Sequence, residues 1–112
     1  MATRKIELLG IPVDCVTYES ALHEACRLAK LPRASALAAS NTHIISSARA
    51  NPEFGAVMRK FDMVLPDGMP LVWMLNLHGA ELPDRVYGPY FMRYALERTP
   101  APWRHYFFGG TA

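Results

Sequence analysis

Short apolar runs alternate with helix-like segments along this chain, and that alternation restricts the possible folds more than any other feature. Apolar runs typical of strands cover residues 6–9, 35–39, 63–65 and 105–108, with a further extended piece at 11–14. Helical spacing and start signals such as Asn51-Pro52 predict helices over about residues 18–30, from 42 onward, and over 52–61, 70–79 and 90–98. This order predicts an α/β fold with a largely parallel, Rossmann-like sheet flanked by helices.

The size and composition of the chain fit one globular domain. It has 112 residues, of which 51% are hydrophobic and 20% are charged, so an intrinsically disordered chain is excluded. A net charge of +2 is too small for bulk charge to indicate a nucleic-acid partner, and we expect none. Residues 1–112 are therefore predicted to form a single α/β domain.

No sequence feature indicates a metal site, a secretory signal or a membrane span. Cys15 and Cys26 form no zinc spacing, and we expect neither a metal nor a cofactor. Glu7 interrupts the first apolar run, whereas a signal peptide contains an uninterrupted apolar segment. The longest apolar stretch, near residues 69–77, is far shorter than a membrane-spanning helix. We expect a cytoplasmic protein.

Polar residues follow three of the predicted strands where each strand ends. These residues are Asn41-Thr42, Asp67-Gly68 and Gly109-Gly110. Ligands of open α/β sheets bind outside the carboxyl ends of the strands. If the strands are parallel, all three features lie at one edge, and this edge is the predicted site.

Asp67 has the residue type and position of a reactive carboxylate. It lies between Pro66 and Gly68, directly after an apolar run, where the turn fixes its backbone. A carboxylate in this position could accept a proton from a sugar hydroxyl that attacks. The alternative is a turn residue and helix cap, because Pro-Asp-Gly is a common turn sequence.

The other candidates each have a structural alternative. Asn41 and Thr42 could bind a substrate or cap the helix that follows. Arg85 could bind a diphosphate through its guanidinium, or could pair with a surface acid. Gly109 and Gly110 could allow close approach of a phosphate, or could form an ordinary turn.

Five motifs in order resemble the WecG/TagA/CpsF family of glycosyltransferases. They are Gly10-Ile11-Pro12-Val13-Asp14, Asn41 ahead of a helix, Leu65-Pro66-Asp67-Gly68-Met69-Pro70, Arg85-Val86-Tyr87-Gly88 and Phe107-Phe108-Gly109-Gly110. The Pro-Asp-Gly-x-Pro and Arg-Val-x-Gly elements are the most specific of the five. The resemblance covers nearly all of the chain but only about the first half of a typical member, so we expect an amino-terminal part that is cut short.

The resemblance implies a sugar transfer in cell-surface polysaccharide synthesis. Members transfer N-acetylmannosamine or a related sugar from a UDP-sugar to a sugar on a polyprenyl diphosphate lipid. The transfer inverts the anomeric centre, and the family's members need no metal. Peripheral contact with the inner face of the plasma membrane is implied as well.

The resemblance also assigns roles to individual residues. Asp67 matches the catalytic base, Asn41 a polar residue that lines the pocket, and Arg85 a further active-site residue. Thr42 is expected to contribute to substrate binding, and Gly109 and Gly110 to nucleotide binding. One departure is Ala39, which stands where many members have threonine.

Two other functions stay open at this stage. The chain could be a truncated, non-catalytic remnant of such an enzyme, in which an uncovered apolar sheet face would favour association between copies. It could also be a different α/β nucleotide-binding protein. Against the latter, the sequence contains neither a GxGxxG motif nor a Walker loop.

Overall fold

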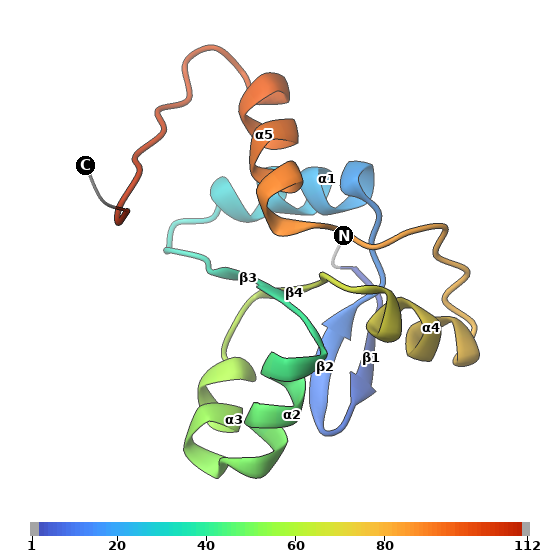
Figure 1. Ribbon diagram of the computed structural model, residues 1–112. Coiled ribbons are helices and arrows are strands. Elements are labelled where there is room, and N and C mark those ends of the chain that lie inside the picture. Colours follow the sequence, from blue (N-terminus) through green and yellow to red (C-terminus); the bar gives the residue numbers. More distant parts are fainter. Residues whose placement is uncertain (1–2, 111–112) are drawn as a thin grey trace.

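The computed structural model describes residues 3–110, which form a small α/β structure (Figure 1). Within these residues, the elements in chain order are β1 (Lys5–Leu8), β2 (Ile11–Asp14), α1 (Tyr18–Ala29), β3 (Leu37–Ser40), α2 (Thr42–Ala50), α3 (Pro52–Met58), β4 (Met63–Pro66), α4 (Met69–Leu77) and α5 (Gly88–Arg98). The predicted alternation of strands and helices is confirmed. α5 begins two residues earlier than the sequence predicts, at Gly88 ahead of Pro89.

The sheet is only partly of the predicted kind. β3 and β4 are parallel, with Leu37 opposite Met63 and Ser40 opposite Pro66. β1 and β2 instead form an antiparallel hairpin. Its turn residues Leu9 and Gly10 have φ values of 54° and 84°, as a two-residue hairpin of the type I′ kind requires.

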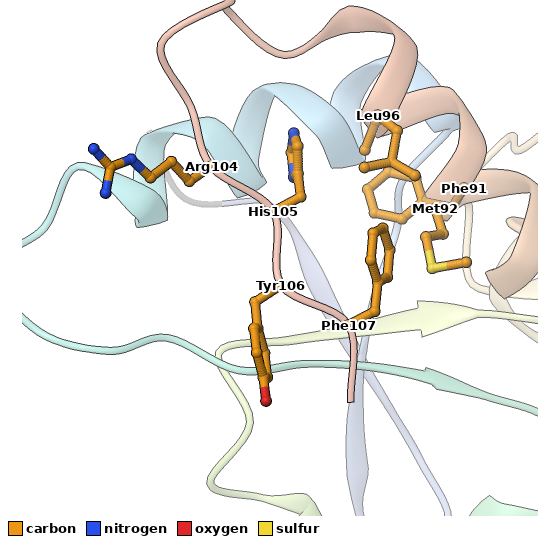
Figure 2. Close-up of a pocket in the computed structure, with 8 residues that line it drawn as sticks. Phe91, Met92, Leu96, Arg104, His105, Tyr106 and Phe107 are labelled. Carbon is orange, nitrogen blue, oxygen red and sulfur yellow. The ribbon is translucent and has the colours of Figure 1, made fainter. Parts of the chain in front are cut away.

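The strand predicted at residues 105–108 is wrong. This segment is extended but has no strand partner in the part of the chain that the structure describes, and Tyr106 and Phe108 are 87% and 95% exposed. Figure 2 shows it beside α5, where Phe107 points toward Phe91 and Met92. An apolar run indicates that its side chains seek an apolar surface, but it does not show that a neighbouring strand provides one. Here the surface beside this segment belongs to helix α5.

β4 lies at the centre of the structure and is buried along its whole length. Successive side chains of a strand point to opposite faces, so Val64 packs on one side with β2, α2 and α4, while Met63 and Leu65 pack on the other with α1 and Val86. In Figure 1, α1 and α5 accordingly lie above the parallel pair, and α2 and α3 lie below it. Cover on both faces is typical of parallel strands.

A buried carboxylate attaches the hairpin to β4. Asp14 is 0% exposed, and its Oδ1 accepts a hydrogen bond of 2.8 Å from the Val64 amide. The Lys5 ammonium donates to both Asp14 oxygens at 2.8 Å, and the Thr3 hydroxyl also donates to this carboxylate. The Val64 amide points away from β3, so Asp14 supplies the acceptor that a further strand would otherwise offer there.

Replacement of Asp14 by alanine should lower the free energy of unfolding by about 3 kcal/mol, because the buried Val64 amide would lose its acceptor and the Lys5 ammonium its carboxylate partner. Urea unfolding followed by circular dichroism measures this loss. Glu7→Ala, at an exposed position of the same hairpin, is the control and should change stability by less than about 0.5 kcal/mol. Equal effects of the two variants would contradict the assignment of Asp14.

A second acid, Asp62, connects the amino-terminal ends of β3 and β4. Asp62 Oδ2 accepts a hydrogen bond of 2.8 Å from the Ala36 amide, and Asp62 Oδ1 lies 2.9 Å from the Arg33 guanidinium. The hydrogen bond from Ala36 and the charges of Arg33 and Lys5 hold the pKa of the Asp62 carboxyl below its ordinary value of 3.8. The ionised form is therefore the one that stabilises the fold.

Asp62→Asn should destabilise the protein at neutral pH and matter less in acid. Because the folded-state pKa lies below the ordinary value, the contribution of the carboxylate is present above about pH 4 and disappears as the pH falls through the folded-state pKa. Urea midpoints of both proteins at about pH 7 and about pH 3 test this. A difference between the two proteins that grows in acid would contradict it.

Candidate functional site

Asn41 and Asp67 lie side by side at the carboxyl ends of β3 and β4. They directly follow the paired residues Ser40 and Pro66, and the Asp67 amide extends the ladder by donating to the Ser40 carbonyl at 3.0 Å. A Cβ built on Gly68 would lie 3.8 Å from the Asn41 Cβ. The predicted convergence of these two strand ends is confirmed, and we call this edge the rim, formed by Asn41, Asp67, Gly68 and Gly88.

The Asp67 side chain bonds to a different helix from the one that follows it. Its Oδ2 accepts a hydrogen bond of 3.1 Å from the Gly88 amide, at the first residue of α5. The N-cap of α4 is Gly68, with a φ of 154° and no side-chain cap. Asp67 therefore does not cap α4, and the helix-cap alternative is wrong for that helix.

Asn41 caps α2, as one of its two interpretations predicted. Its Oδ1 accepts a hydrogen bond of 3.0 Å from the Ile44 amide. The cap uses the amide oxygen alone, so the Nδ2 group of this exposed residue is available as a donor at the rim. A cap and a ligand contact are therefore compatible at Asn41.

Two buried hydroxyl groups flank Asn41 in the sequence. Ser40 Oγ and Thr42 Oγ1 are inaccessible to solvent and have no hydrogen-bond partner within residues 3–110. Thr42 is the first residue of α2, and its hydroxyl is turned into the protein. The Thr42 hydroxyl is therefore not exposed at the rim, whereas its predicted role in substrate binding would require exposure there.

Arg85 lies on a loop that runs along the end of β4. The next residue, Val86, donates its amide to the Pro66 carbonyl at 2.9 Å and so attaches this loop beside Asp67. The Arg85 guanidinium lies 4.6 Å from the centre of the Tyr87 ring. Within the described residues it forms no ion pair, so the alternative of a surface arginine paired with an acid is not observed.

Gly109 and Gly110 make no contact with the rim. Both have positive φ, at 104° and 80°, and a Cβ added to either would meet nothing within 4 Å. They follow the extended segment that lies beside α5 rather than a strand of the sheet. The prediction that the glycine pair follows a strand at the same edge of the sheet as Asn41 and Asp67 is therefore wrong.

Three helices begin at the rim. α2 starts after Asn41, α4 after Gly68, and α5 at Gly88, whose amide reaches Asp67. Neither α4 nor α5 has a side-chain cap from its own N-cap residue. The amino-terminal ends of helices attract negative charge, so this convergence favours an anionic ligand.

The sequence interpretation assigned no individual role to two residues of this arrangement, Gly88 and Tyr18, although Gly88 belongs to the Arg-Val-x-Gly element. Gly88 had a usable signal, because proline is common in the first turn of a helix and Pro89 follows it directly. Tyr18 had none, since the sequence predicts only that it lies in the helix over residues 18–30. Its hydroxyl in fact accepts a hydrogen bond of 3.0 Å from the Tyr87 amide.

A comparison with protein families agrees with the family that the sequence motifs resemble. The model of the glycosyl transferase WecG/TagA/CpsF family matches residues 6–112. The chain belongs to this family. WecG/TagA/CpsF proteins are glycosyltransferases of cell-surface polysaccharide synthesis. A search of curated proteins gave no match.

Within residues 3–110, no group of three or more His, Cys, Asp and Glu side chains could hold a metal ion. No helix in the same range is both long and apolar enough to cross a membrane.

Substitutions of Asn41 should separate its cap from its amide donor in this WecG/TagA/CpsF protein. Asn41→Ala should lower stability by about 1 kcal/mol, whereas Asn41→Asp keeps an oxygen cap and should stay within a few tenths of a kcal/mol. The aspartate variant loses the Nδ2 donor, so its sugar transfer should fall about tenfold. Urea unfolding and a transfer assay measure the two effects, and full activity of Asn41→Asp would exclude a ligand role for the amide nitrogen.

Proposed function

We propose that this protein transfers an N-acetylmannosamine-type sugar or a related hexose from a UDP-sugar to a sugar carried on a polyprenyl diphosphate. The observation that carries the proposal is the placement of Asp67. Its carboxylate lies at the rim between the starts of three helices, with one oxygen bonded to Gly88. The lipid acceptor would bring the protein to the inner face of the plasma membrane as a peripheral partner.

Asp67 acts as the general base in this proposal. Its carboxylate accepts the proton of the acceptor hydroxyl while that oxygen forms a bond to the anomeric carbon of the donor. The bond from the anomeric carbon to the diphosphate oxygen breaks, and UDP leaves with the electron pair. Attack from the side opposite to UDP inverts the anomeric configuration.

Positive electrostatic potential at the rim would stabilise the diphosphate. The amino-terminal ends of α4 and α5 lie there, and neither helix has a side-chain cap from its own N-cap residue. Arg85, attached beside β4 through Val86, supplies a guanidinium that can bind two phosphate oxygens at once. The stack of Arg85 on Tyr87 limits the positions that its side chain can take.

The decisive test is Asp67→Asn, which keeps the shape and an oxygen acceptor for Gly88 but removes the base. Transfer from UDP-N-acetylmannosamine to a lipid-diphosphate acceptor should fall by about a hundredfold or more, while UDP binding measured by calorimetry stays within about threefold. Glu7→Gln, which removes an exposed carboxylate from β1, is the matched control and should keep its activity.

Two outcomes would count against this function. Undiminished turnover of Asp67→Asn would remove Asp67 from the mechanism. If the unchanged protein binds UDP but transfers no sugar, the rim is a nucleotide-binding site without the proposed reaction.

A further inference from the structure

The start of α5 contacts the Asp67 carboxylate through main chain alone. The Gly88 amide donates to Oδ2 at 3.1 Å, and within residues 3–110 the Asp67 side chain makes no other hydrogen bond. The Asp67 backbone is fixed separately by the bond from its amide to the Ser40 carbonyl. Gly88 therefore determines how the carboxylate is turned, and it leaves Oδ1 facing away from this bond.

Close approach, rather than an unusual backbone angle, explains why residue 88 is a glycine. A Cβ added there would lie 2.9 Å from the Ala39 Cβ and 3.4 Å from Asp67 Oδ2. The first distance is too short for two carbon atoms, whereas the second is an ordinary contact. Any side chain at residue 88 would therefore push α5 away from β3 and lengthen the bond from its amide to Asp67.

Tyr18 of α1 anchors the residue directly before Gly88. Its hydroxyl oxygen accepts the Tyr87 amide at 3.0 Å, and its ring meets the Tyr90 ring edge-on at 4.8 Å and the Tyr94 ring at 5.8 Å. The N-cap residue Tyr87 supplies no side-chain cap of its own. Instead, the consecutive amides of Tyr87 and Gly88 donate to acceptors from other elements. The two amides belong to adjacent peptide units that are joined at the Tyr87 Cα, so a shift at Tyr87 moves the Gly88 amide as well.

We propose that Tyr18 and Gly88 are positioning residues for Asp67: Tyr18 sets the start of α5, and the Gly88 amide orients the carboxylate so that Oδ1 faces the acceptor hydroxyl. This inference rests on the proposed function for its catalytic meaning. The hydrogen-bond arrangement itself does not depend on that function and can be measured without any substrate.

The first experiment measures the exchange of the Gly88 amide hydrogen by nuclear magnetic resonance in the full 12.5-kDa chain. Asp67→Ala should speed the exchange of this amide at least about tenfold relative to amides in the middle of α5, because a bond to a carboxylate is lost. Tyr18→Phe keeps the ring and removes the hydroxyl, and it should speed exchange at Tyr87 and, to a smaller extent, at Gly88. Tyr90→Phe is the matched control, because its hydroxyl forms no hydrogen bond within the described residues.

The second experiment measures sugar transfer. Tyr18→Phe should lower kcat about fivefold with KM nearly unchanged, whereas Tyr90→Phe should alter neither. Gly88→Ala should lower kcat at least about tenfold, and adding Ala39→Gly should recover most of this loss, because it removes the carbon that the new Cβ meets at 2.9 Å.

The outcomes separate this inference from the proposed function. Unchanged exchange of Gly88 in Asp67→Ala would overturn the positioning bond whatever reaction the protein catalyses. Faster exchange in a protein that transfers no sugar would confirm the bond and reject the function. Full transfer activity in both Tyr18→Phe and Gly88→Ala would overturn the positioning role.

Discussion

The structure depends on β4, whose backbone forms hydrogen bonds along both edges and whose two faces are covered by other elements. One edge pairs with β3 in parallel register. The other edge has no strand within the described residues. Two of its polar groups have other partners: the Val64 amide donates to the Asp14 carboxylate, and the Pro66 carbonyl accepts from the Val86 amide. Unpaired backbone groups in a buried strand would be costly, so these two contacts allow so short a strand to lie at the centre of the protein.

The same contacts determine where the functional groups lie. The Val86 amide brings the loop with Arg85 to the end of β4, and it delivers Gly88 to Asp67 two residues later. On the other side, the parallel register places Asn41 next to Asp67. The rim thus results from pairing between elements rather than from any local motif.

The parts that the sequence predicted correctly are those with local causes. Asn51 followed by Pro52 marks the start of α3, and the Asn51 side chain caps it as expected. The adjacency of Asn41 and Asp67 was predictable because residues that follow neighbouring parallel strands share an edge. The family resemblance rested on the same strand-end residues and is confirmed by the match over residues 6–112.

The features that the sequence did not predict depend on contacts with residues that are distant in the sequence. The run at 105–108 has the composition of a strand, but composition does not reveal which surface is available to it, and it lies beside α5. The role of Gly88 depends on its distance from Ala39, forty-nine positions earlier. The acceptor role of Tyr18 depends on an amide sixty-nine residues away, which helical spacing cannot indicate.

These long separations have a consequence for how the site forms. The contacts that build the rim join residues 40 with 67, 67 with 88, and 18 with 87, and none lies within one helix or hairpin. Closing such long loops is entropically costly until several contacts form together. The rim should therefore be absent from isolated helices and from partly folded chains, and it should assemble and dissolve in a single cooperative step with the chain as a whole.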